Sequence, residues 1–253
     1  MKVLIDRNSL DPIDLAAAYF GGGLDINEYL KIRQPLIKEI IEYGEREYWQ
    51  LVNCVTILSC DMKSELADAG KYWGDVPDFE MFYLMVRTLP PEKTKILFGA
   101  NIDFRRFGWY RNPETDTYCM VDIENGYKID ELLHAKIFNY VAAIHGIVKK
   151  QEFAGNEITR EFMVEEDRMN KRRMRVKPYS STLFPLASYL SSTHKCAPAE
   201  IGEMRIFAFL DNIKRTSTIN TSNLLLNGIY AGKVDGEKVN KKTLDPMRDI
   251  YAK

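Results

Sequence analysis

The sequence contains few of the residues and patterns from which a reaction is usually inferred. Only three histidines occur in 253 residues, together with four cysteines: Cys54, Cys60, Cys119 and Cys196. The first residues, Met1–Arg7, reach charged side chains after only three apolar ones, so we expect no signal peptide there and reduced thiols in a cytosol. No apolar run approaches the roughly 18 residues of a membrane-spanning helix, so we expect no membrane segment.

The chain also lacks an excess of charge of either sign. Its 35 Lys and Arg residues nearly balance its 36 Asp and Glu residues, which leaves a formal net charge of -1. Such a balance provides no overall field that would attract nucleic acid or an acidic membrane surface. Any contact of that kind must come from a local patch.

Metal and catalytic motifs are missing as well. His194 and Cys196 lie close together, but zinc sites generally use three or four protein ligands. His134 and His145 share a helix face at a separation of about 16 Å, which is too long for one ion. There is no G-x-S-x-G elbow for a nucleophile. We therefore predict no catalytic residue, no cofactor and no metal.

Two glycine-rich stretches resemble phosphate loops only superficially. Gly21–Gly23 follows a helical pattern and lacks the Lys-Ser/Thr ending of a P-loop, so we interpret it as a hinge after an N-terminal arm. The segment from Gly228 to Val234 has three residues between its glycines instead of four. It also has valine where Ser or Thr would hold magnesium.

Apolar residues at helical spacing dominate what is present. The longest stripe, from Pro35 to Ser59, predicts one core helix that Gly44 weakens by roughly 1 kcal/mol relative to Ala. Similar patterns predict further helices over 11–20, 62–69, 79–89, 129–148, 156–175, 183–190, 200–213 and 224–230, and a short one opening at Asp245. Polar residues predict a loop at 191–195 and a break at 216–220.

One region has the pattern of strands. Residues 96–98, 102–110 and 117–123 are β-like, and residues 111–116 and 124–126 are typical turns. Together these patterns predict a mainly α protein, a multi-helix globular bundle with a small antiparallel β-hairpin insertion. We divide it into an N-terminal arm (1–23), an N-terminal helical part (24–94), the β-hairpin insertion (95–128) and a C-terminal helical part (129–253).

A basic run is the best local candidate for a binding site. It lies in the second half of the helix predicted over 156–175 and contains Arg168, Lys171, Arg172, Arg173, Arg175 and Lys177. Such a run can neutralise phosphates. However, it lacks aromatic residues that would stack on bases, and the acidic first half of the helix would repel a nucleic-acid backbone. Contact with an acidic protein segment and simple exposure are the alternatives, and nucleic acid is the least favoured partner.

Several short blocks together carry a family resemblance. They are Leu30–Pro35 followed by Glu39–Glu45, Asp78–Phe82, Glu165–Arg168, Gly228–Gly232, Val239–Lys242 and Met247–Asp249. From about Leu30 onward the chain resembles the tail-assembly-chaperone-like proteins of tailed bacteriophages that infect Gram-positive hosts. The resemblance implies no catalytic residue. It implies a phage morphogenesis protein that acts in the host cytoplasm, binds the tape-measure protein, with the tail tube as a possible further partner, and keeps the long apolar helices of the tape-measure protein soluble.

The amphipathic helices support the same hypothesis, in which a helical partner lies against an apolar groove. Two alternatives stay open. One is a structural component of the virion, such as a connector or tail protein, and the other is a nucleic-acid-binding phage protein that uses the basic run at 168–177. A homo-oligomer is possible, but no residue in the sequence indicates its symmetry.

Overall fold

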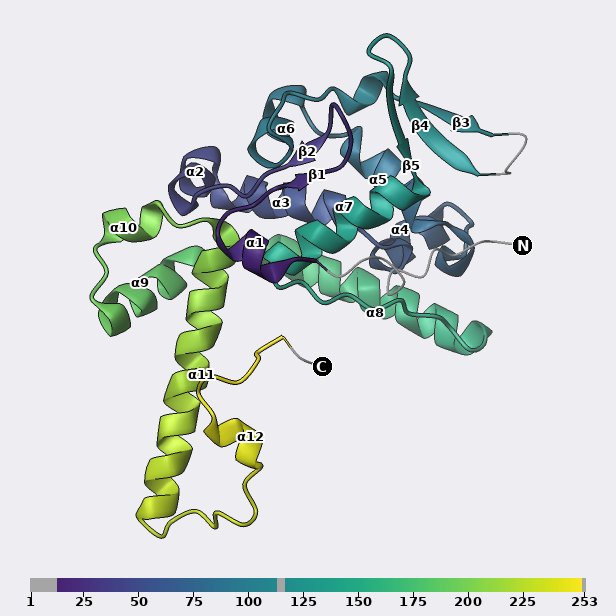
Figure 1. The fold of residues 1–253 in the computed structure, drawn as a ribbon. Helices are drawn as coiled ribbons and strands as arrows, with labels where there is room; N and C mark the ends of the chain where they lie inside the picture. The colour runs from purple at the N-terminus through teal and green to yellow at the C-terminus, as the bar shows by residue number, and fades with distance from the viewer. Residues whose placement is uncertain (1–12, 113–116, 252–253) are drawn as a thin grey trace.

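The structure is a computed structural model, and it describes residues 13–112 and 117–251. The fold is mainly α-helical with small antiparallel sheets, which confirms the predicted fold class. Most helices pack into one body, and a long helix projects from it (Figure 1). Residues 3–5, whose apolar side chains would also suit a short strand, lie outside the described residues.

In chain order the helices are α1 (Leu15–Tyr19), α2 (Ile37–Tyr43), α3 (Glu45–Val55), α4 (Lys63–Asp68), α5 (Asp78–Val86), α6 (Pro91–Phe98), α7 (Glu131–Ile144), α8 (Glu157–Val176), α9 (Leu183–His194), α10 (Pro198–Gly202), α11 (Ile206–Tyr230) and α12 (Lys241–Leu244). The strands are β1 (Leu24–Asp25), β2 (Lys31–Ile32), β3 (Gly108–Arg111), β4 (Tyr118–Asp122) and β5 (Tyr127–Asp130).

The core of the body forms around α3, which contacts α5 and α7. Its residues Tyr48, Leu51, Val52 and Val55 recur at steps of three and four and are completely buried. His145 also lies in this core, where its Nδ1 donates to the carbonyl of Val141 and its Nε2 accepts from the Tyr48 hydroxyl at 2.5 Å. Burial lowers the pKa of His145 to about 4, so the imidazole is neutral near pH 7 and acts in packing.

The predicted continuous helix from Pro35 to Ser59 is wrong. The chain forms two helices, α2 and α3, which meet at Gly44. Gly44 has φ +102° and ψ 112°, a conformation that glycine reaches easily and other residues rarely adopt. The apolar spacing continues on both sides of the bend because both helices bury a face against the same core, so the periodicity alone did not reveal the break.

The β region differs from the predicted hairpin. β3, β4 and β5 form a three-stranded antiparallel sheet, in which Met120 of β4 pairs with Trp109 on one side and Ile129 on the other. Residues 96–98, predicted as strand, belong to helix α6, which has Pro91 in its first turn and the left-handed Gly99 at its end. A short apolar run does not distinguish a strand from a buried helix turn. The first residues of the helix predicted over 129–148 are strand β5, and the helix begins at Glu131.

The described part of the N-terminal arm is packed against the body. α1 begins at Leu15 with Asp14 as its cap, and β1 and β2 form an additional two-stranded hairpin that we did not predict. The carbonyl of Gly22, in the triple glycine, accepts hydrogen bonds from Gln34 and from the Tyr140 hydroxyl at 2.9 and 2.6 Å. These two hydrogen bonds hold the glycine stretch to the body.

The C-terminal helices also have different boundaries. α9 continues through residues 191–194, where we predicted a loop, and the helix predicted over 200–213 is two helices, α10 and α11. α11 then runs without a break through the polar residues 216–220. Thr216 and Thr218 each donate a hydroxyl hydrogen bond to the carbonyl four residues earlier, which is an arrangement that threonine adopts inside helices. α12 ends before Asp245, so the short helix predicted to open there is absent from the described residues.

Candidate functional site

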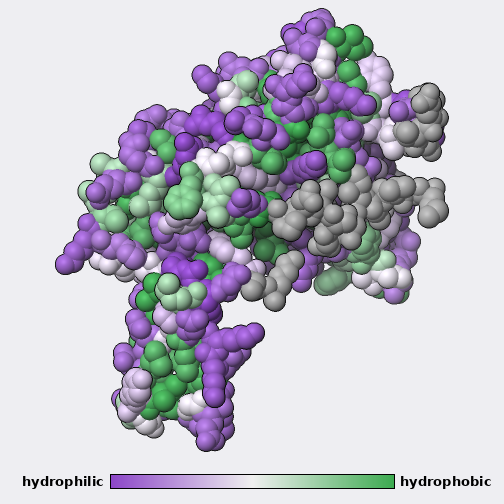
Figure 2. Space-filling view, viewed as in Figure 1, coloured by the Kyte–Doolittle hydropathy of each residue, from purple (hydrophilic) through white to green (hydrophobic). Residues whose placement is uncertain are grey.

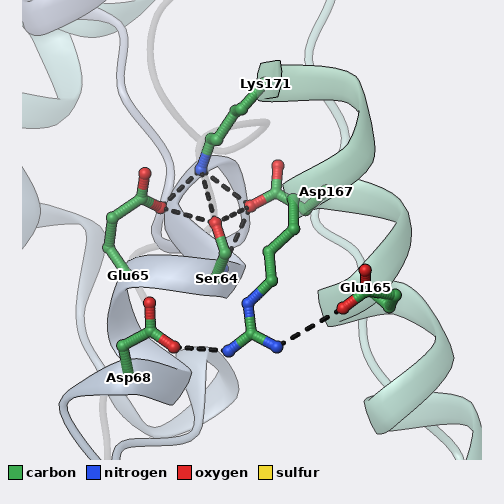
Figure 3. A network of polar contacts seen from close by, with 7 residues as sticks. Ser64, Glu65, Asp68, Glu165, Asp167 and Lys171 are labelled. Atoms are coloured by element: carbon green, nitrogen blue, oxygen red, sulfur yellow. Dashed lines mark hydrogen bonds and ion pairs between the residues drawn. The ribbon is translucent and has the colours of Figure 1, made fainter. Parts of the chain in front are cut away.

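The basic run lies on α8, and the structure divides its six residues into two groups. Arg168 and Lys171 face α4 and form ion pairs within the chain. Lys171 Nζ contacts Asp167 at 2.7 Å, Ser64 Oγ at 3.2 Å and the carboxylate of Glu65 (Figure 3). These two cations therefore hold α8 against α4. While these ion pairs are formed, the two side chains cannot bind another molecule.

Asp167 is the centre of this fastening. Its Oδ2 accepts from the backbone N–H of Ser64 at 3.0 Å and from the Ser64 hydroxyl at 2.6 Å, as well as from Lys171. Burial by itself would raise the pKa of Asp167, but the hydrogen bonds from Lys171 and Ser64 outweigh it and lower the pKa. Burial would likewise raise the pKa of Glu65, but hydrogen bonds, chiefly from Lys171, outweigh it and lower the pKa. The network is therefore a charged structural contact.

The other four basic residues, Arg172, Arg173, Arg175 and Lys177, are exposed. Arg172, Arg173 and Lys177, with Val176, line a wide and shallow depression at the end of α8. It is open to solvent and does not enclose a small molecule. The exposed basic patch is thus smaller than the sequence suggested, and it directly follows the acidic half of the same helix.

The candidate ligands for chemistry are dispersed or buried. His134 packs against the rings of Phe79 and Phe82, with centroids 5.4 and 4.6 Å away. His194 Nε2 forms a hydrogen bond with Thr216 at 2.6 Å. In the part of the chain that the structure describes, no three His, Cys, Asp or Glu side chains gather as a metal site requires.

The glycine-rich stretch from Gly228 to Val234 forms the end of α11. Gly232 adopts φ +67°, and the N–H of Lys233 donates to the carbonyl of Gly228 at 2.9 Å. The last carbonyls of a helix carry partial negative charge, which repels a phosphate. This geometry gives a physical reason for rejecting a phosphate loop here.

The second candidate surface is the arm (residues 214–250), which consists of the outer part of α11, the returning loop and α12 (Figure 1). α11 has 25 residues and is about 37 Å long. Its base is fixed to the body, since the N–H of Ile206 donates to the carbonyl of Pro35 and the Arg205 guanidinium donates to the carbonyl of Gln34 at 2.8 Å. The arm therefore leaves the body in a defined direction.

The arm has no apolar core of its own. Among the described residues, the last buried apolar side chain is Phe209, and no residue of the arm packs against the core of the body. The side chains buried within the arm are polar: Thr216, Thr218 and Ser222. Yet the end of α11 is strongly apolar, with Leu224 and Tyr230 exposed and three further residues partly exposed, Leu225, Leu226 and Ile229. In Figure 2 apolar residues are visible along this projection.

Hydrogen bonds hold the returning segment to α11. Arg248 donates to Ser222 Oγ and to the carbonyl of Thr243 at 3.0 and 2.9 Å, and Arg215 donates to the carbonyl of Arg248 at 2.7 Å. The Tyr251 hydroxyl donates to Asp211 at 2.8 Å near the base. These contacts leave Leu224 and Tyr230 exposed, so both residues are accessible to another molecule.

Sequence reasoning missed the arm because the predicted break at residues 216–220 separated its two halves. The apolar run at 224–230 predicts a helix, but its spacing does not indicate that this helix lies outside the body. No helix in the described part of the chain combines the length and the apolar character needed to cross a membrane. Comparison with protein-family models, with curated proteins and with solved structures found no significant match to this chain.

Proposed function

We propose that this protein acts without catalysis, as an assembly factor that binds a helical segment of another protein through the arm. The observation that carries the proposal is the apolar end of α11, which projects from the body and has no buried apolar side chain beyond Phe209 among the described residues. Exposed apolar side chains that gather at one place on a protein are typical of a site for protein contact. An amphipathic helix is the partner that fits best, because its apolar face would cover that of α11.

The family resemblance gives this partner an identity within the proposal. Three of the blocks that carry the resemblance, 228–232, 239–242 and 247–249, lie on the arm. We therefore propose that the partner is the tape-measure protein of a tailed phage and that the protein keeps it soluble in the host cytoplasm before the tail tube assembles. A permanent place in the virion is the alternative.

Co-expression with the tape-measure protein of the same phage tests the proposal. We expect the two proteins to copurify and the soluble fraction of the tape-measure protein to increase. Leu224→Asp should abolish both effects, because it places a charge in the apolar surface. Asn223→Asp adds the same charge at the neighbouring exposed position and should leave both effects unchanged.

An unchanged soluble fraction of the tape-measure protein, or equal behaviour of the two variants, would contradict the proposal. Mass spectrometry of purified particles separates the two roles. An assembly chaperone should be scarce in the particles, whereas a structural component should be present in a fixed copy number.

A further inference from the structure

The outer face of α8 (Ile158, Phe162, Met169 and Val176) is apolar and has no partner within the described chain. These side chains are 80%, 68%, 44% and 85% exposed. At about 100° per residue they fall within about 40° of one another around the helix. The opposite side of α8 carries the buried Val164 and the contacts to α4. α8 thus presents a second apolar surface, separate from the arm.

Charged residues flank this outer face in an ordered way. Glu165 and Glu166 lie in the first half of the helix, one on each side of the face, and Arg172 and Arg173 lie in the same arrangement in the second half. All four are exposed. A helix dipole favours the same order of charges, but it does not require them to border an apolar stripe.

The positions of the apolar residues match an antiparallel copy of the same helix. If two α8 helices cross antiparallel at Met169, then Phe162 of one lies opposite Val176 of the other, because both are seven residues from Met169. The two Met169 side chains meet at the two-fold axis. Phe162, Met169 and Val176 then each contact an apolar residue, whereas Ile158 extends beyond the end of the other helix.

The charges select the same arrangement. In the antiparallel pair Glu165 lies on the same side as Arg172 of the other helix, and Glu166 lies on the same side as Arg173. The two residues of each pair are offset along the helix axis by only about 1.5 Å, the rise of one residue. In a parallel pair acidic residues would face acidic residues and basic would face basic. Opposite charges across the pair attract and like charges repel, so only the antiparallel pair is complementary on both sides.

We propose that two copies of this chain associate through the outer face of α8, antiparallel and centred on Met169. Such an interface is isologous, since the same patch serves both subunits. One helix face is smaller than the roughly 800 Å² per partner of a standard interface, so the dimer is reversible. The proposal does not depend on the proposed function, because the arm and the outer face of α8 share no residue.

Sedimentation velocity of the full chain over a range of concentrations measures the association. Met169→Glu places two like charges together on the two-fold axis and should raise the dissociation constant by at least about tenfold. Met174→Glu is the matched control. Met174 is a methionine of the same helix and is even more exposed, 75% against 44%, but it lies on the other side, so its substitution should leave the dissociation constant unchanged.

Charge reversal tests the flanking residues. Glu165→Arg with Glu166→Arg, and separately Arg172→Glu with Arg173→Glu, should each weaken self-association because like charges then face one another. An equimolar mixture of the two variants should form heterodimers, since every facing pair in the mixed dimer is again opposite in sign. Circular dichroism of each variant checks that it is folded.

Cysteine crosslinking tests the orientation, in a background with Cys119→Ser and Cys196→Ser. Phe162→Cys and Val176→Cys should form a disulfide with each other when the two proteins are mixed. Neither should crosslink with itself, because equivalent residues would be about 21 Å apart along the axis, beyond the reach of a disulfide. Crosslinking of either variant with itself would overturn the antiparallel arrangement.

The remaining outcomes are equally decisive. A monomer at the highest attainable concentration would overturn the proposal, as would a dimer that Met169→Glu does not weaken. Loss of tape-measure binding in Met169→Glu, with no change in self-association, would assign the outer face of α8 to a different partner and overturn it as well.

Discussion

Substitution of Gly44 by alanine tests the bend between α2 and α3, where the sequence predicts one continuous helix. Gly44 joins α2 to α3 at φ +102° and ψ 112°. A residue with a Cβ atom rarely adopts a conformation with such a φ, and holding it there costs about 1–3 kcal/mol. We therefore expect Gly44→Ala to lower the free energy of unfolding by that amount.

The magnitude comes from the backbone and not from a clash. An added Cβ would meet Oε2 of Glu47 at 2.4 Å, but this atom ends an exposed, flexible side chain that can move away. The bend also places Glu45, the next residue, where its carboxylate accepts hydrogen bonds from Ser181, Thr182 and Leu183 at the start of α9. If the backbone relaxed toward a continuous helix, these hydrogen bonds would be lost, and the cost would be at the upper end of the range.

Urea unfolding of the wild type and the variant measures the effect as a shift of the midpoint at constant slope. Gly155→Ala is the control, since Gly155 has an ordinary φ and nothing lies within 4 Å of its added Cβ. That control should be neutral or slightly stabilising. The bend and a continuous helix predict changes in stability of opposite sign for Gly44→Ala. In a continuous helix Gly44→Ala would increase stability by about 1 kcal/mol, and such an increase would refute the bend.

Two further predictions concern the carboxylates of Glu45, which is buried, and Asp167, which is partly exposed. Burial would raise the pKa of Glu45, but hydrogen bonds from Ser181, Leu183 and Thr182 outweigh it and lower the pKa from 4.5 to about 2, which corresponds to about 3 kcal/mol of stability at neutral pH. Because the folded pKa is depressed, this contribution is complete above pH 4.5 and is lost as the pH falls toward 2, so unfolding curves of Glu45→Gln and wild type should differ most at pH 7 and converge in acid. Lys171→Met should destabilise the protein by about 1–2 kcal/mol, since it leaves Asp167 with fewer partners. Arg175→Met, at an exposed position of the same helix, should have almost no effect in the same thermal or urea assay.

The helix α8 shows how far local sequence can predict a structure. Its observed bounds, Glu157–Val176, nearly coincide with the predicted 156–175, and Asn156 caps it by accepting from the N–H of Thr159 at 2.8 Å. Cap, charge order and periodicity all agree along this segment. The role of its basic residues did not follow from the sequence, because α4 pairs with Arg168 and Lys171 across about a hundred residues of chain.

The sequence by itself determined the helical character of this protein, since apolar spacing, caps and turn residues act within a few positions of one another. It also placed strand β4 and the turn that follows it. Only the tertiary structure decided where long helices bend or continue, as at Gly44 and along α11. It also decided which charges are paired and which apolar faces stay exposed, because each of these depends on what another part of the chain covers.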